Sequence, residues 1–328
     1  MTGLPRAGRP TRYVDRGRDV TSFSRRAFLM GAAILGLEGL DPRTRAHAGA
    51  PPRSPVQSGG VEVSIAPSRP QPGDVLLFQA TGAPSDVRVE WDGRPVAVFP
   101  SGSRWVALIG IDLDTRPGVI GWRVTRPSAA KNGGALAAGA VTVRSRTFPT
   151  QPLTLPKGMV DLDAETLARV DTERAALKAA LAAGAPERLW RGPFRTPVEG
   201  GRPTGGFGLR RVLNGQPRSP HTGYDWAAPV GTPVLAVNAG RVALVAEHFF
   251  AGRNVVLDHG LGLFTFYYHL DETRVGAGEP VAAGQIIGAV GATGRVTGPH
   301  LHFAVVLGGA RVDPEALLAL TPPPELLP

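Results

Sequence analysis

The stretch Gly291-Ala-Thr-Gly-Arg-Val-Thr-Gly-Pro-His-Leu-His-Phe303 joins a glycine-rich turn to a His-x-His pair, His300 and His302. A strand is predicted here by the apolar residues that surround the pair, Leu301, Phe303, Val305 and Val306. Residues two apart on a strand lie on the same face. We therefore expect both imidazoles to point to one side, where one can bind a metal ion while the other reaches water held at that ion.

About eighty residues earlier the chain reads Pro220-His-Thr-Gly-Tyr-Asp225, which contains a His-x-x-x-Asp motif. Zinc in catalytic sites prefers three protein ligands drawn from imidazole nitrogen and carboxylate oxygen, and leaves a fourth position to water. His221, Asp225 and one histidine of the later pair meet that requirement. Each motif alone is a weak signal, and the sequence around the two motifs makes it stronger.

Two further motifs complete the pattern, Gly206-Phe-Gly-Leu-Arg-Arg211 upstream and Tyr267-Tyr-His-Leu270 between the histidine motifs. With the four motifs in this order, residues 190 to 316 resemble the lysostaphin and LytM-like zinc metallopeptidases of peptidase family M23. The resemblance implies an antiparallel β catalytic domain that hydrolyses peptide bonds of peptidoglycan. It also implies one zinc ion held by His221, Asp225 and His302, with His269 and His300 as the catalytic imidazoles.

The two catalytic imidazoles would divide the proton chemistry. Zinc lowers the pKa of water bound to it toward about 7. We expect His300 to be the general base, because a titrating imidazole works best near the operating pH. His269 would orient the water or stabilise the developing oxyanion, and the sequence leaves the division between the two histidines open.

The enzyme reading has an alternative within the same family. Some members have lost zinc ligands and act as activators of other cell-wall hydrolases. None of the expected ligand positions is substituted here, which favours a zinc endopeptidase. A catalytically silent, peptidoglycan-binding activator is the alternative, and a zinc peptidase that acts on proteins would carry the same metal site.

Several other polar residues were weighed as site residues. We expect His259 to be structural or to support the metal ligands through hydrogen bonds, His248 to lie on the surface, and Asp258 to cap a turn. Further candidates have two open roles each. Tyr267 and Tyr268 either contact substrate or pack in the core, and Arg210 and Arg211 are assigned first to structure and second to substrate carboxylates.

The segment Gly276–Gly288 is similar to the hairpin of biotinyl and lipoyl carrier domains. Those carriers need a lysine to hold the cofactor. The lysines of this chain are Lys131, Lys157 and Lys178, all of them upstream. A carrier function is therefore excluded.

The N-terminal stretch Ser24-Arg-Arg-Ala-Phe-Leu29 resembles a twin-arginine export signal. The apolar stretch Ala27 to Leu40 that follows is too short and too polar for a membrane span, which needs about 20 residues. Ala46-His-Ala48 offers a cleavage site. We therefore expect residues 1–48 to be removed on export to the periplasm or cell envelope, with no stable membrane span afterwards; a disordered basic tail is the alternative.

Composition agrees with an envelope hydrolase. The 328 residues give room for two modest domains, and the absence of cysteine excludes disulfides and thiolate chemistry. The formal charge is +9, but residues 1–48 contain nine arginines and four acidic residues, so 27 basic and 23 acidic residues remain. Such a mild excess favours weak, salt-sensitive attraction to an anionic polymer such as peptidoglycan. No clustered basic helix or aromatic-basic strand face predicts nucleic-acid binding, and protein partners stay unknown.

The chain is predicted to be mainly β, with an N-terminal β-sandwich-like domain, a connecting helix and a C-terminal antiparallel β catalytic domain. We expect a linker at 49–60, the sandwich at 61–150, a helical connector at 151–189, the peptidase domain at 190–318 and a tail at 319–328. Strands are predicted at 61–65, 75–79, 87–91, 105–111, 119–124 and 141–143, and in the catalytic domain at 234–237, 241–246, 254–257, 263–268, 285–290 and 301–307. A helix is expected from Asp163 to Ala183, with Asp161 or Asp163 as its N-cap. The N-terminal domain could be a spacer, or it could dock substrate or inhibit the catalytic groove.

Overall fold

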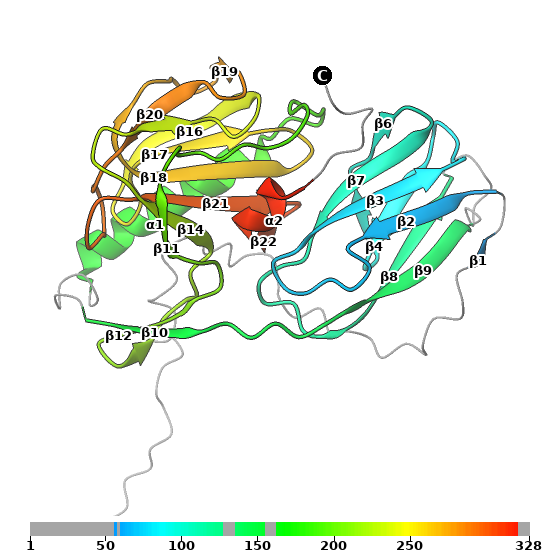
Figure 1. Cartoon of the computed structure of the whole chain (residues 1–328), viewed down its shortest axis with the longest axis horizontal. Coiled ribbons are helices and arrows are strands. Elements are labelled where there is room, and N and C mark those ends of the chain that lie inside the picture. Colours follow the sequence, from blue (N-terminus) through cyan, green and yellow to red (C-terminus); the bar gives the residue numbers. More distant parts are fainter. Residues whose placement is uncertain (1–55, 58–59, 127–134, 155–161, 321–328) are drawn as a thin grey trace, which may run out of the picture. The chain divides into compact units, whose positions relative to one another are not determined.

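A computed structural model describes residues 56–57, 60–126, 135–154 and 162–320. The predicted signal peptide and nearly all of the expected linker and tail lie outside these residues. The prediction of a mainly β chain is confirmed: strands dominate, and the described residues hold two helices, α1 (Ala164–Ala182) and α2 (Pro314–Leu318) (Figure 1). Neither helix is long and apolar enough to cross a membrane.

The N-terminal strands form two antiparallel sheets, as the alternation of apolar residues predicted. The five-stranded sheet has the order β1 (Val56–Gln57), β9 (Ala135–Val143), β8 (Gly118–Thr125), β4 (Arg88–Trp91) and β5 (Arg94–Val96). The four-stranded sheet has the order β2 (Glu62–Ala66), β3 (Val75–Thr81), β7 (Arg104–Gly110) and β6 (Phe99–Ser101). The Asp92-Gly93 turn joins β4 to β5, with both residues at positive φ (51° and 72°) as a tight hairpin requires.

Strand β3 is buried on both faces, because successive side chains enter two different cores. Leu76 and Phe78 pack in the core between the two N-terminal sheets. Val75 and Leu77 belong to another core, which includes Trp190 and much of the C-terminal sheet. The N-terminal sheets therefore share a hydrophobic core with the rest of the chain.

Helix α1 begins where the sequence predicted. Asp163 is its N-cap, and the Asp163 carboxylate accepts a hydrogen bond of 2.8 Å from Thr166 N. Leu177 and Leu181 pack against a buried cluster that contains Phe264 of the large sheet. The apolar side of the helix is thus a packing surface.

The C-terminal part is built on a ten-stranded sheet (Figure 1). Its main order is β11 (Arg202–Gly205), β14 (Gly223–Ala227), β21 (Leu301–Leu307), β18 (Leu263–Thr273), β17 (Gly252–Asp258), β16 (Gly240–His248) and β19 (Pro280–Val281). Three shorter strands attach to this path: β15 (Pro233–Leu235), β20 (Ile286–Val290) and β22 (Ala310–Val312). All pairings in this sheet are antiparallel, as predicted.

A small sheet beside it departs from the expected pattern. Strand β10 (Thr150–Leu153) pairs in parallel with β12 (Arg210–Leu213), which in turn forms a hairpin with β13 (Gln216–Pro217). The expected helical connector thus begins with a strand. This pairing places Gln151 opposite Arg211.

The register of three neighbouring strands assembles the candidate site. On β14 and β21, Asp225 lies opposite His302. On β18 and β21, Tyr268 lies opposite His302, so His269 follows one residue further along. Motifs that are far apart in sequence therefore meet at one end of these strands.

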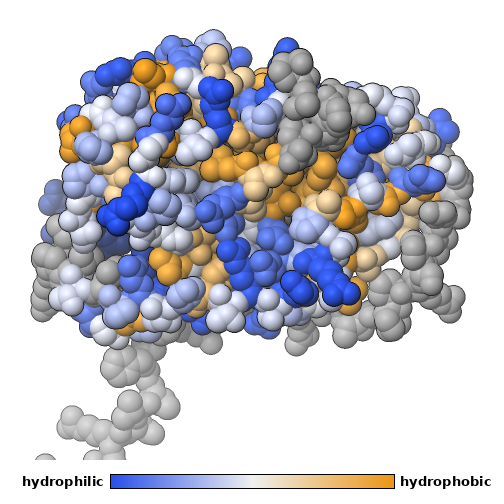
Figure 2. All heavy atoms as spheres, viewed as in Figure 1, coloured by the Kyte–Doolittle hydropathy of each residue, from blue (hydrophilic) through white to orange (hydrophobic). Residues whose placement is uncertain are grey.

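The surface of the described chain exposes few large apolar side chains. In Figure 2 the hydrophobic residues gather in the middle of the face shown, with hydrophilic residues around them. Among the described residues the large hydrophobic side chains that are clearly exposed are Val119, Val230 and Ile286.

Candidate metal centre

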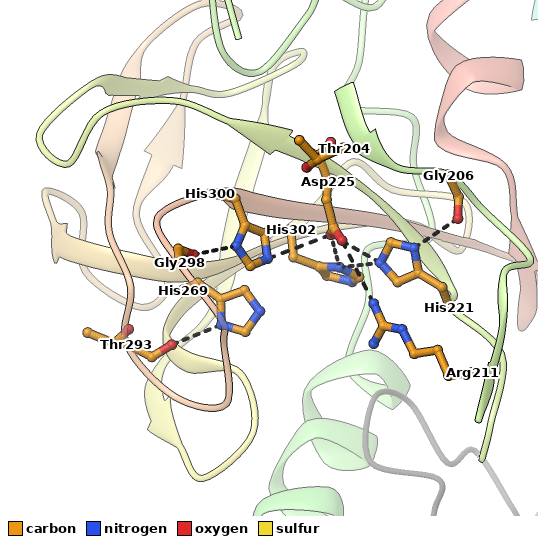
Figure 3. Close-up of polar contacts among 10 residues, drawn as sticks. All are labelled: Thr204, Gly206, Arg211, His221, Asp225, His269, Thr293, Gly298, His300 and His302. Atoms are coloured by element: carbon orange, nitrogen blue, oxygen red, sulfur yellow. Dashed lines mark hydrogen bonds and ion pairs between the residues drawn. The ribbon is translucent and has the colours of Figure 1, made fainter. Parts of the chain in front are cut away.

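Three ligand atoms converge at the candidate metal centre (Figure 3). His221 Nε2 lies 3.1 Å from Asp225 Oδ1 and 2.8 Å from His302 Nδ1. His302 Nδ1 lies 2.8 Å from Asp225 Oδ1. Among the described residues this trio is a group whose ligand atoms could hold one metal ion.

The tautomer of His221 supports a cation at this point. His221 Nδ1 is 2.9 Å from the carbonyl oxygen of Gly206. A carbonyl oxygen can only accept, so Nδ1 donates and the neutral ring keeps its lone pair on Nε2. Nε2 therefore faces Asp225 and His302 as an acceptor. A tetrahedral ion with bonds of about 2.0 Å has ligand atoms about 3.3 Å apart, close to the spacing of these three atoms, so the donor set fits zinc.

The ring of His302 is held by packing. It stacks on Tyr268 with ring centroids 5.5 Å apart and an interplanar angle of 16°. A Cβ atom on Gly223 would lie 2.6 Å from His302 Nε2, so the glycine leaves the room that the ring occupies. His302 Nε2 is buried without a hydrogen-bond partner, and burial, opposed by Asp225, lowers the pKa of His302 to about 4. The ring is thus kept neutral, as a metal ligand must be.

Asp225 is ionised at this site. Burial opposes its negative charge, but the close contacts with His221 and His302 outweigh burial and hold its pKa well below 3.8. Arg211 Nη2 lies 3.8 Å from Asp225 Oδ2, on the side of the carboxylate away from His300 in Figure 3. Asp225 therefore supplies the negative charge that a divalent ion needs.

His300 lies at the edge of the trio, just before β21. Its Nδ1 is 2.8 Å from the carbonyl oxygen of Gly298, so Nδ1 donates and Nε2 is left as the acceptor. Nε2 lies 3.9 Å from Asp225 Oδ1. The side chain is 17% exposed, so this nitrogen can meet a molecule in the cleft.

His269 has an unusual backbone conformation. Its φ is +66°, in the left-handed region, and its N–H donates to Ala251 O at 2.8 Å. His269 Nδ1 lies 2.9 Å from Thr293 O, which again leaves Nε2 as the acceptor. Burial, together with the neighbouring His302 and His300, lowers the pKa of His269 to about 3. Strained backbone of this kind concentrates at functional sites. The residues around His269 do not indicate this conformation.

The five predicted site residues all border or lie under one cleft of about 290 Å³. Asp225, His269, His300 and His302 line it, while His221 is buried below. Three arginines also line the cleft, Arg211, Arg218 and Arg295. Sequence reasoning did not single out Arg218 or Arg295. Their nearness in sequence to His221 and His300 was the available signal.

The other candidate residues of the sequence supply no ligand atom to the trio. Asp258 caps its turn by accepting from Gly260 N at 2.8 Å. His259 is fully buried and bonds Ala239 O and the Thr265 hydroxyl, which makes it structural. Tyr267 and Tyr268 are buried in the core, so the packing alternative is correct for both. The expectation for His248 was wrong, because its ring is half-buried at the end of β16.

Comparisons with known proteins agree with this geometry. The family model for peptidase family M23 matches residues 219–314. Peptidoglycan DD-endopeptidase ShyB of Vibrio cholerae is 46% identical over 94 residues, 29% of this chain and 22% of that protein. Peptidoglycan DD-endopeptidase ShyC of the same organism is 39% identical over 126 residues, 38% of this chain and 29% of that protein. The chain thus matches between a fifth and a third of the length of these curated relatives.

A longer match comes from a crystal structure. A Pseudomonas aeruginosa protein assigned to peptidase M23 superposes with a TM-score of 0.60 at 33% sequence identity. The match covers 76% of this chain and 95% of the Pseudomonas protein. The similarity therefore extends beyond the segment that carries the metal ligands.

Proposed function

Because the chain belongs to peptidase family M23, we propose that it is a zinc-dependent endopeptidase that hydrolyses peptide bonds of bacterial peptidoglycan. One observation carries the proposal: three ligand atoms of His221, Asp225 and His302 lie within 3.1 Å of one another, beside His269 and His300 at a cleft. The names of the Vibrio relatives point to the same substrate class, and to the DD-type cross-link in particular.

Zinc is the metal that this donor set suits best. Two imidazole nitrogens and one carboxylate oxygen are typical of catalytic zinc sites with three protein ligands. When bound, zinc supplies Lewis-acid polarisation of the substrate carbonyl and a source of hydroxide near neutral pH.

His300 is the proposed general base. Its Nδ1 is anchored to Gly298 O, so its Nε2 can take a proton in the cleft and return it to the leaving amine. His269 is similarly anchored to Thr293 O. Because its pKa is low and its Nε2 is then an acceptor, His269 can orient an attacking water but has no proton with which to bind an oxyanion. Orientation of water is therefore the role we propose for His269.

A silent activator of other hydrolases is the second candidate function. It would bind peptidoglycan and release nothing. The complete trio of ligands and the two anchored imidazoles argue against it, since an activator needs neither a metal ion nor a proton carrier. The same argument does not separate cell-wall substrates from protein substrates, which makes the choice of substrate the central point of the test.

Export by the twin-arginine route is part of the proposal. It is supported by Arg25 and Arg26 ahead of an apolar stretch and by the Ala46-His-Ala48 site. The periplasm or cell envelope is the compartment in which peptidoglycan is available. Replacement of Arg25 and Arg26 by lysine should block export, as measured by cell fractionation, and unaffected export would reject the assignment.

The decisive experiment is digestion of purified peptidoglycan by the zinc-loaded chain, with the muropeptides resolved by mass. Loss of cross-linked dimers establishes the endopeptidase and identifies its bond. Intact dimers with binding to sacculi retained would make the protein a binding module. His302→Ala should lose metal by elemental analysis, whereas His269→Ala and His300→Ala should keep it and lose turnover by about 10²- to 10⁴-fold. Equal metal loss in all three variants would reject these roles.

A further inference from the structure

The cleft carries more positive charge than the proposed reaction explains. Arg211, Arg218 and Arg295 line it, and Asp225 is the one acidic residue among the described residues that do so. Asp225 is already committed to the metal trio. A divalent ion would add further positive charge. Three guanidinium groups thus share a confined space with one carboxylate.

The fold holds the arginines by backbone contacts. Arg211 and Arg218 flank a hairpin whose turn, Asn214-Gly215, has positive φ at both residues (49° and 80°). Arg218 N donates to Arg211 O at 2.9 Å, which closes the hairpin. Their positions relative to the cleft are therefore set by the β12–β13 hairpin. Neighbouring Arg210 is exposed and is not among the residues that line the cleft.

Arg295 comes from the loop that leads to His300. Its backbone N–H donates to Phe250 O at 3.0 Å, and its guanidinium lies 4.3 Å from the centre of the Phe250 ring. Stacking on an aromatic face holds the plane of a guanidinium group in place. Burial and the charges of Arg211 and Arg218 lower the pKa of Arg295 to about 10, so it stays protonated at neutral pH.

Arg211 is the arginine nearest the metal trio. Its Nε is buried and has no hydrogen-bond partner. Its Nη2 lies 3.8 Å from Asp225 Oδ2, which is beyond hydrogen-bond distance. The ion pair with Asp225 therefore leaves part of its donor capacity unused. A buried, incompletely paired cation favours an incoming anion, and guanidinium groups suit carboxylates in particular because two parallel N–H···O bonds can form.

We propose that Arg211, Arg218 and Arg295 form a subsite that binds a free carboxylate of the substrate close to the bond that is cleaved. The proposal rests on the proposed function and narrows its substrate class. In a D-alanyl–diaminopimelate cross-link, the carbon that bears the scissile nitrogen also bears a carboxylate. A glycine bridge has no carboxylate there. The subsite therefore favours cleavage of the diaminopimelate link over a glycine bridge.

A terminal carboxylate of an uncross-linked stem peptide offers the same chemistry. Two pairs of ligands distinguish these two carboxylates. The first pair is a cross-linked dimer whose diaminopimelate carboxylate is either free or amidated. The second pair is a monomeric stem peptide whose C-terminus is either free or amidated. Binding is measured by calorimetry on the zinc-loaded full chain carrying His300→Ala, so that no ligand is consumed.

We expect the free-acid dimer to bind about tenfold or more tightly than its amide. The preference should fall below about twofold in Arg218→Gln and in Arg295→Gln, and should persist in Arg210→Gln, the exposed neighbour. Arg211→Gln is uninformative alone because it also disturbs Asp225. A preference seen with the monomeric pair instead supports the subsite and assigns the terminal carboxylate as its occupant.

Three results would overturn the subsite: equal binding of acid and amide in both pairs, no binding of any ligand, or an acid preference that survives both Arg218→Gln and Arg295→Gln. The proposed function is tested separately by digestion with the wild-type chain. If the wild type cleaves no dimer while the acid preference holds, the endopeptidase proposal fails and the subsite stands. If the wild type cleaves acid and amide dimers equally well and binds them equally, the subsite fails and the endopeptidase stands.

Discussion

Acid should destabilise the folded chain through His259. The ring is completely buried, with Nδ1 2.8 Å from Ala239 O and Nε2 2.8 Å from the Thr265 hydroxyl. Nδ1 must donate to the carbonyl, so Nε2 accepts from Thr265 and the neutral ring is fully satisfied. Burial, only partly offset by the bond to Ala239, lowers the pKa of His259 from 6.5 to about 4.

The sign of the effect follows from proton binding. Between pH 6.5 and pH 4 the unfolded chain binds a proton at His259 that the folded chain does not bind. The free energy of unfolding therefore falls as the pH falls through this window. The two pKa values differ by about 2.5, and each unit corresponds to about 1.4 kcal/mol, so about 3 kcal/mol of stability should be lost by pH 4.

The assay is urea unfolding between pH 7.5 and pH 4, with chelator in every sample so that release of metal does not contribute. His259→Gln should be less stable than the wild type at pH 7.5, because one of two buried hydrogen bonds is lost. That difference should shrink by about 3 kcal/mol toward pH 4, since glutamine does not titrate. His248→Gln, at a half-buried histidine, should show a smaller change. A difference between wild type and His259→Gln that is independent of pH would refute the reasoning.

Three further substitutions test individual contacts in the fold. Gly223→Ala would place a Cβ 2.5 Å from Phe303 O and 2.6 Å from His302. We expect the free energy of unfolding in urea to fall by about 1–3 kcal/mol and zinc to bind more weakly in a competition titration. Unchanged affinity for zinc would contradict the role given to this glycine. Glu173→Gln weakens the two 3.0 Å hydrogen bonds from Phe249 N to the Glu173 carboxylate. Hydrogen exchange of the Phe249 amide should therefore accelerate about tenfold. Glu165→Gln, on the same helix, should leave this exchange rate unchanged. Arg311→Gln removes hydrogen bonds of 2.6 and 3.0 Å to Asp112. Thermal unfolding should show a loss of about 1 kcal/mol in the free energy of unfolding, and this loss should diminish in high salt. An unchanged melting temperature at low salt would reject a stabilising role for this ion pair.

The elements that the sequence predicted well are those with short-range signals. Leu301–Leu307 is a strand with the predicted bounds, because an uninterrupted apolar run next to a glycine-rich turn has few alternatives. Asp163 caps α1 because its carboxylate reaches an N–H three residues on. The convergence of His221, Asp225 and His302 was implied by the family resemblance and not by any local signal.

The unpredicted features depend on tertiary contacts. The parallel pairing of β10 with β12 joins segments about sixty residues apart. Pro152 lies within β10, and a proline inside a segment argues against predicting a strand there. His269 takes a left-handed conformation, and its N–H donates to Ala251 O instead of forming a regular strand-to-strand hydrogen bond. Arg218 and Arg295 lie in irregular segments, where no periodicity indicates the side to which a side chain turns.

The core that β3 shares with the C-terminal sheet makes substitutions in the two parts depend on each other. Val75, Leu77 and Leu108 lie in one buried cluster with Trp190 and Val312. A Cβ atom on Gly110 would lie 2.8 Å from the Val312 side chain. Substitutions on either surface thus need compensation on the other, and recombination that exchanged the N-terminal sheets alone would leave two mismatched apolar faces.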